Sequence, residues 1–124
     1  MIKMQSYKDL EIYQLANEIA LDIHKITMKL PKFEIFEEGS QIRRSSKAVS
    51  ANIVEGFGRR RYRQDYIKFL IYAHSSCDET KEHLDYIFKT GSFDKKEIFE
   101  DLMNKLDKLS KKINKFIQAV ESGL

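Results

Sequence analysis

The chain has 124 residues, of which 42% are hydrophobic and 33% are charged, and its formal net charge is +3 at pH 7. This size and balance indicate one soluble globular domain, residues 1–124, and exclude a disordered or collagen-like chain. No apolar run approaches the roughly 20 residues that span a bilayer, and the N-terminus lacks the apolar core of a secretory signal, so we expect no membrane contact. The single cysteine, Cys77, cannot form an internal disulfide, which favours a reducing cytoplasm.

The first helix is expected from about Lys8 to Leu30, because apolar residues recur there every three or four positions. These residues are Ile12, Ala16, Ile19, Ile23, Ile26 and Leu30. Ser6 and Asp9 have the spacing of an N-terminal capping box. Pro31 ends the helix, because proline lacks an N–H and disfavours helical geometry in the residue before it.

A second helix is expected over residues 38–57, after a connection in which Phe33 and Phe36 tuck under the bundle. This helix has few large apolar residues and many small ones. The small residues are Ser45, Ser46, Ala48, Ser50 and Ala51. Because small side chains let neighbouring helices approach closely, we expect contacts on more than one side. Gly56 and Gly58 then supply the backbone freedom for a helix stop.

A third helix is expected over residues 63–89, ending before Gly91, and a fourth is expected after Asp94, which we predict to be its N-cap. Cys77 lies on the apolar stripe of the third helix, so we interpret it as a buried thiol rather than a nucleophile. The apolar residues of the fourth helix, from Phe99 to Val120, alternate spacings of three and four, as in a left-handed bundle. Four helices with short connections predict an all-α fold, an antiparallel up-and-down four-helix bundle.

Charge is concentrated in one segment, residues 41–63, which contains all six arginines, one lysine and a single acid, so that it carries +6. Guanidinium groups suit phosphates, and Tyr62 and Tyr66, interleaved with the arginines, can stack on unpaired bases. The candidate nucleic-acid-binding residues are therefore Arg43, Lys47, Arg59, Arg60, Arg61, Tyr62 and Arg63. In the alternative interpretation, the arginines pair with acids on neighbouring helices or subunits, or form a solvated loop.

The sequence contains little that indicates a metal-binding or catalytic site. The three histidines are His24, His74 and His83, and none has the glutamate three positions earlier that di-iron bundles use. The pairs His74–Asp78 and Glu79–His83 have the spacing of ordinary surface pairs on a helix. The sequence shows no serine–histidine–acid set. We therefore expect no catalytic site, no metal site and no cofactor.

Four motifs occur in an order that resembles a known family. They are YKDLEIYQLA at 7–16, QIRR at 41–44, NIVEG at 52–56 with Gly58-Arg59 following, and FLIYAHSSCDE at 69–79. Across about residues 7–120 the chain resembles the four-helix-bundle proteins also called S23 or 23S ribosomal RNA intervening-sequence proteins. The resemblance implies an up-and-down bundle, a ring-like homopentamer and no established catalytic activity. A related protein accompanies the reverse transcriptase of diversity-generating retroelements and engages RNA and that enzyme through a basic pentamer surface.

The family motif maps onto Gln41, Arg43, Arg44, Asn52, Glu55, Gly56, Arg59, Ser76 and Glu79, which we interpret as mainly structural. Asn52 and Glu55 need polar partners if they are buried, and Arg44, Ser76 and Glu79 are the candidates. The chain departs from the family pattern at Ser45, Ser46, Ser50 and Ser75, which affects packing detail rather than the fold.

The function favoured by the sequence is that of a non-enzymatic cytoplasmic oligomer that binds RNA or another nucleic acid through its arginine-rich segment. The alternative is a structural or adaptor oligomer that contacts a protein partner and whose arginines form inter-subunit ion pairs.

Overall fold

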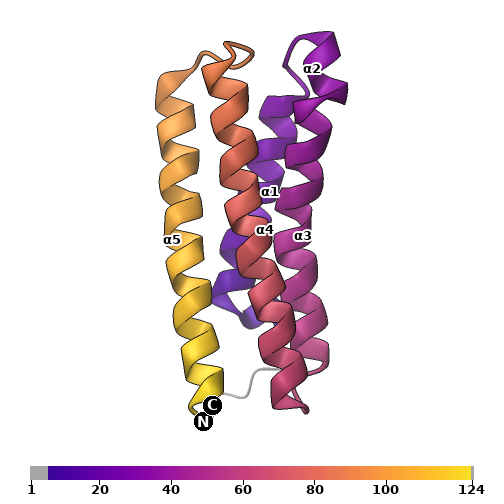
Figure 1. The fold of residues 1–124 in the computed structure, drawn as a ribbon, viewed down its shortest axis with the longest axis vertical. Helices are drawn as coiled ribbons and strands as arrows, with labels where there is room; N and C mark the ends of the chain where they lie inside the picture. Colours follow the sequence, from indigo (N-terminus) through magenta and orange to yellow (C-terminus); the bar gives the residue numbers. More distant parts are fainter. Residues whose placement is uncertain (1–5, 124) are drawn as a thin grey trace.

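The structure, a computed structural model, describes residues 6–123, and four long helices of this part form a single up-and-down bundle (Figure 1). The helices are α1 (Glu11–Thr27), α3 (Glu38–Gly58), α4 (Arg63–Lys89) and α5 (Lys96–Glu121). The short 3-10 helix η1 (Tyr7–Asp9) precedes α1, and the short helix α2 (Lys32–Phe36) joins α1 to α3. α3 packs against α1 and α4, while α5 packs against α4 and α1. The predicted antiparallel four-helix bundle is confirmed.

The first long helix is shorter at both ends than predicted. Ser6 and Asp9 do form a capping box, but it caps η1, because Leu10 is extended and interrupts the helical run. At the other end α1 stops at Thr27, whose hydroxyl donates to the His24 carbonyl oxygen. The chain then turns before Pro31, which is the N-cap of α2.

The prediction that the two connection phenylalanines tuck under the bundle is wrong. Phe33 is 66% exposed and Phe36 is 71% exposed, on a face of α2 that points away from the core. The buried residue of α2 is Glu34, which is 5% exposed. Its Oε1 accepts the Glu38 backbone N–H at 3.1 Å, and its Oε2 accepts the Ser92 hydroxyl. The Glu34 carboxylate therefore satisfies the start of α3 and ties it to the α4–α5 connection.

The α4–α5 connection also differs from the prediction. Asp94 is not the N-cap of the last helix: α5 begins at Lys96 with Lys95 as its N-cap, and no side chain caps it. α4 ends at Lys89, as predicted from Gly91, which adopts a left-handed φ of +81°. That conformation is one that glycine adopts without the steric cost of a Cβ.

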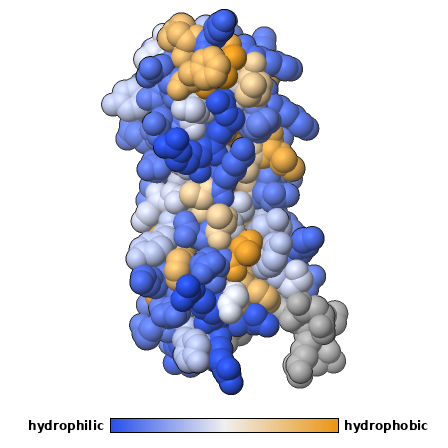
Figure 2. Space-filling model, turned by 90° about the vertical axis from the view of Figure 1, so that its right-hand side faces the viewer, coloured by the Kyte–Doolittle hydropathy of each residue, from blue (hydrophilic) through white to orange (hydrophobic). Residues whose placement is uncertain are grey.

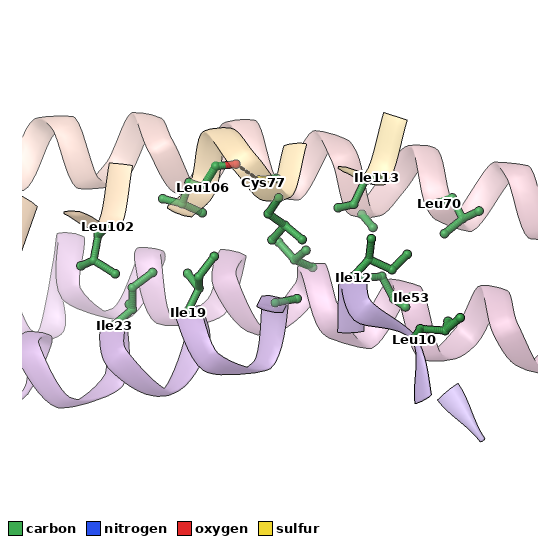
Figure 3. Packing of buried hydrophobic residues seen from close by; sticks show 14 of the residues in the cluster. Leu10, Ile12, Ile19, Ile23, Ile53, Leu70, Cys77, Leu102, Leu106 and Ile113 are labelled. Carbon is green, nitrogen blue, oxygen red and sulfur yellow. Dashed lines mark hydrogen bonds between the residues drawn. The ribbon is translucent and has the colours of Figure 1, made fainter. Parts of the chain in front are cut away.

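The core runs the length of the bundle and draws aliphatic residues from all four long helices (Figure 3). The predicted seam of α5 is buried at Leu102, Leu106, Leu109, Ile113 and Val120. Cys77 is fully buried, as predicted, and its thiol donates to the Leu106 carbonyl oxygen at 3.4 Å. Burial raises the pKa of the Cys77 thiol to about 12, so it stays protonated at neutral pH.

Small residues let α3 approach α4 closely, as predicted. Ser45 and Ser46 are buried, and the Thr80 hydroxyl donates to Ser45 Oγ at 2.9 Å. Gly56 lies so close to α4 that an added Cβ would meet Phe69 Cβ at 3.2 Å and Tyr66 Cδ1 at 3.3 Å. α3 is thereby held between α1 and α4 with a fixed register.

Candidate nucleic-acid interface

The structure separates the positively charged segment into two groups. Arg59, Arg60, Arg61 and Arg63 lie around the α3–α4 loop, at the end of the bundle where α5 also ends (the lower end in Figure 1). Arg43, Arg44 and Lys47 lie in the opposite half of α3. At a rise of about 1.5 Å per residue, Arg44 is about 22 Å from Arg59 along the helix. The sequence segment is therefore not one patch in space.

Arg43 is half-buried and joins three elements of the fold. Its Nη1 donates to Thr27 Oγ1 at 3.0 Å, and its Nη2 donates to the Ile35 carbonyl oxygen at 2.7 Å. One guanidinium thus joins α3 to the end of α1 and to α2, where it satisfies polar groups of both elements. Arg43 stays a predicted contact residue, but its guanidinium is already engaged in these two hydrogen bonds.

Arg59 lies at the same end of the bundle, but two carboxylates flank its charge. Its Nε lies 2.9 Å from Glu55 Oε1, and its Nη1 lies 3.5 Å from Asp65 Oδ2. The hydrogen bond with Glu55 raises the pKa of Arg59 further. The guanidinium also lies 4.9 Å from the centre of the Phe69 ring. Arg59 therefore holds the α3–α4 loop rather than offering a free charge.

Arg60 is positioned by the last turn of α3. Its Nη1 donates to the Phe57 carbonyl oxygen at 2.9 Å, and its guanidinium lies 3.9 Å from the centre of the Phe57 ring. Stacking of this kind fixes the plane of the guanidinium while its remaining N–H groups stay exposed. Arg60 is thus pre-oriented at the surface.

Arg61 and Arg63 are exposed and form no ion pair with any residue in the range 6–123. Tyr62, between them, is 63% exposed. A shallow hollow of about 250 Å³ lies at this end and is lined by Arg60, Arg61, Arg63, Tyr66 and Val120. Burial raises the pKa of Tyr66 to about 12, although the nearby Arg60 charge acts to lower it. The basic end, as we call Arg60, Arg61, Tyr62 and Arg63, combines three guanidinium groups with an exposed aromatic ring.

Sequence reasoning missed Val120 as a part of this end. Val120 lies far along the chain from the arginines and joins them only because α5 returns to the same end of the bundle. No local signal in the sequence could have identified it.

Several family-motif positions form contacts within the chain, and their partners differ from the candidates. Asn52 Nδ2 donates to the Ala48 carbonyl oxygen at 2.9 Å, and Glu55 is exposed and pairs with Arg59. The Ser76 carbonyl oxygen accepts the Thr80 hydroxyl at 2.7 Å. Gly56 provides the close α3–α4 approach.

Gln41, Arg44, Lys47 and Glu79 are exposed, and the three charged residues form no ion pair with the described residues. Arg44 and Lys47 therefore belong to a separate positive surface on α3.

A serine–histidine–acid arrangement, which the sequence did not reveal, forms between α4 and α5. Ser110 Oγ lies 3.0 Å from His74 Nε2, and His74 Nδ1 lies 3.8 Å from Asp78 Oδ2. Ser110 is buried in the middle of α5, where the surrounding backbone N–H groups donate within the helix and cannot form an oxyanion hole. We therefore interpret this arrangement as a polar contact between α4 and α5.

Among residues 6–123, no group of three or more histidine, cysteine, aspartate or glutamate side chains is placed to hold a metal ion. His83 instead contacts Glu38, with 2.7 Å between Nδ1 and Oε2. No helix in this part of the chain is both long enough and apolar enough to cross a membrane.

The fold and this surface define an antiparallel four-helix bundle with arginines grouped at one end. The chain belongs to the 23S rRNA-intervening sequence protein family, whose sequence profile matches residues 8–115. It is also similar to a crystal structure of a Bacteroides thetaiotaomicron protein of unknown function from the S23 ribosomal protein family. The TM-score is 0.75 at 25% identity, over 86% of this chain and 95% of the other. No curated protein matches the chain.

Proposed function

We propose that this protein is a non-enzymatic, cytoplasmic homo-oligomer that binds RNA through the basic end of its bundle. The observation that carries the proposal is a pair of exposed arginines, Arg61 and Arg63, that flank the exposed Tyr62 in the sequence and have no ion-pair partner among residues 6–123. Guanidinium groups bind phosphates with directed hydrogen bonds, and an exposed aromatic ring can stack on an unpaired base. The family name, which refers to 23S rRNA, is consistent with this ligand class.

The geometry favours a single-stranded or looped RNA over a duplex. The basic end is a compact surface around a shallow hollow, not a long groove that could follow a helix. Sequence-specific contacts to RNA are usually made to unpaired bases that stack on aromatic side chains. We therefore expect loops or single strands to bind more tightly than paired RNA of the same length.

The test is a filter-binding titration with a single-stranded and a fully paired RNA of equal length. Arg61→Gln/Arg63→Gln is expected to raise the Kd for the single strand about 10-fold or more, because two phosphate contacts are lost. The matched control is Lys111→Gln/Lys115→Gln, which removes two exposed charges from the outer face of α5. Equal weakening by the two variants, or no binding by the parent protein, would refute an RNA site at this end.

A structural or adaptor oligomer is the second candidate function. It is favoured by a specific observation, the exposed Arg44 and Lys47 on α3, which have no ion-pair partner among residues 6–123 and are available to acids of a neighbouring subunit. Under this function, oligomer assembly is intact and RNA binding is absent.

A further inference from the structure

The two ends of the bundle present different surfaces. Apolar residues gather at the upper end in Figure 2, where Phe33 and Phe36 of α2 are exposed, whereas the lowest part of the same view is hydrophilic. At the lower end, the hollow of about 250 Å³ lies among the α3–α4 loop, the first turn of α4 and the last turn of α5. This volume is below the roughly 300–1,000 Å³ of pockets that enclose drug-sized ligands, so the hollow suits one small group.

Guanidinium groups reach this hollow from different elements. Arg63 is the first residue of α4, yet a Cβ added at Gly123, beyond the end of α5, would lie 3.4 Å from Arg63 Nη2. The Arg63 side chain therefore extends from the start of α4 to the end of α5. Arg60 is fixed at the end of α3 by the carbonyl oxygen and the ring of Phe57. With Arg61, three guanidinium groups line one opening.

The nearby acids leave these three arginines their charge. Glu55 and Asp65 both pair with Arg59, at 2.9 Å and 3.5 Å. The arginines that line the hollow have no ion-pair partner among residues 6–123, and Glu121 at the end of α5 pairs with none of them. Arg59 thus engages the local carboxylates, and the hollow remains positive.

Tyr66 adds an unused hydrogen-bond donor to the hollow. It is only 7% exposed, its ring packs edge-on against Phe116, and its hydroxyl forms no hydrogen bond with residues 6–123. Every enclosed side-chain oxygen in this part of the chain has a partner, so the Tyr66 hydroxyl must be open to solvent, and Tyr66 lines the hollow. Because burial raises the pKa of Tyr66 to about 12, the hydroxyl keeps its proton at neutral pH and can donate it to an anion.

We propose that this hollow binds the terminal phosphate monoester of an RNA strand, while the exposed Tyr62 stacks on the base next to it. This inference rests on the RNA binding of the proposed function and names the part of the RNA that is recognised. An internal phosphodiester carries one negative charge. A phosphate monoester carries about −1.5 to −2 at pH 7 and has three strong acceptor oxygens. Three guanidinium groups and a phenol donor match the monoester.

The experiment compares single-stranded RNAs of one sequence that differ only at their ends. One has a 5′-phosphate, one has a 3′-phosphate, and one has hydroxyl groups at both ends. Fluorescence anisotropy with a label in the middle of the strand measures each Kd. The parent protein is expected to bind one of the phosphorylated RNAs at least about 10-fold more tightly than the hydroxyl-ended RNA, because hydrogen bonds to a charged group are added.

Two variants test whether the hollow is the source of this preference. Tyr66→Phe removes the hydroxyl and keeps the ring that packs on Phe116, and it is expected to lower the preference about 3- to 10-fold. Arg63→Gln is expected to lower it by at least as much, because a charged donor is lost. The matched control is Tyr86→Phe, which removes an exposed hydroxyl elsewhere on α4 and is expected to bind like the parent. Circular dichroism checks that each variant keeps its helices.

Free phosphates distinguish the RNA end from a small ligand. Inorganic phosphate and a nucleoside monophosphate are added as competitors, and both are expected to displace the phosphorylated RNA only at concentrations far above its Kd. A monophosphate that binds as tightly as the phosphorylated RNA would overturn the proposal, because the ligand would then be a nucleotide.

The outcomes also separate this inference from the proposed function. Equal Kd values for phosphorylated and hydroxyl-ended RNA would overturn the terminal-phosphate site and leave RNA binding in place. A preference that survives both Tyr66→Phe and Arg63→Gln would equally overturn the site. No binding of any of the three RNAs would refute the proposed function together with the inference.

Discussion

Arg43 and Arg61 carry the same side chain, but their surroundings give them different roles. The Arg43 guanidinium donates to Thr27 and to the Ile35 carbonyl oxygen, so it belongs to the scaffold. Arg61 is exposed and has no ion-pair partner among residues 6–123. Clustering in the sequence therefore did not mean a common role.

Replacing Arg43 is expected to destabilise the protein. Arg43→Ala removes two hydrogen bonds from a charged donor and leaves Thr27 Oγ1 and the Ile35 oxygen without this partner, at a cost of about 1–3 kcal/mol. Arg61→Ala removes an exposed side chain and is expected to change stability by less than about 0.5 kcal/mol. Urea unfolding of both variants measures the difference, and equal stabilities would contradict the structural role of Arg43.

The buried thiol of Cys77 is expected to make the folded protein less stable at high pH. The unfolded thiol ionises near its ordinary pKa of 9.0, whereas the buried thiol holds its proton until about 12. The unfolded state binds fewer protons in that interval, so the stability contribution is complete below pH 9 and is lost as the pH rises towards 12. Between about pH 7.5 and about pH 10, the parent is expected to lose about 1.4 kcal/mol more than Cys77→Ala. Identical losses in urea unfolding would show that the thiol is not protected by burial.

At the scale of elements, the α3–α4 contact depends on a glycine. An added Cβ at Gly56 meets Phe69 and Tyr66 at 3.2–3.3 Å, and a Cβ cannot rotate away, so Gly56→Ala is expected to cost about 1–3 kcal/mol. Gly58, two residues later, has no atom within 4 Å of that position. Gly58→Ala is therefore expected to be neutral or to stabilise by about 0.5 kcal/mol, since alanine loses less backbone freedom in a helix. Thermal unfolding compares the two, and a neutral Gly56→Ala would contradict the close packing.

The long helices were predictable because their apolar residues repeat at helical spacing over many turns. The predicted third helix has the bounds of α4, and the predicted second helix ends one residue before α3 does. The short α2 was not predictable in this way. Its two phenylalanines face solvent while Glu34 is buried, because the Glu34 carboxylate binds groups that lie 4 and 58 residues away in the sequence.

The candidate site was predictable in composition but not in arrangement. The sequence identified the arginines, yet separating Arg43 and Arg59 from the free guanidinium groups required the positions of Thr27, Ile35 and Asp65. The contact between Ser110 and His74 likewise joins residues 36 positions apart. Contacts of this range depend on how the helices pack, which periodicity does not specify.

For the whole molecule, the number of free arginines predicts the salt dependence of RNA binding. Three guanidinium groups per chain, rather than six, give a log–log slope of Kobs against salt of about −2 for single-stranded RNA contacted by one chain. Arg61→Gln/Arg63→Gln is expected to bring the slope to about −0.7. The slopes are measured with a single-stranded RNA short enough for one chain to contact it. A slope near −4 would mean that the second positive group, on α3, also contacts RNA.

Photochemical crosslinking tests the location of the RNA contact most directly, because the sequence separates the two positive groups into different peptides. Cleavage after lysine gives residues 33–47, with Arg43 and Arg44, and residues 48–68, with Arg60, Arg61, Tyr62 and Arg63. Ultraviolet crosslinking to single-stranded RNA followed by mass spectrometry is expected to find the RNA adduct on residues 48–68, centred on Tyr62. Adducts confined to residues 33–47, or found mainly on peptides of α5, would contradict RNA binding at the basic end.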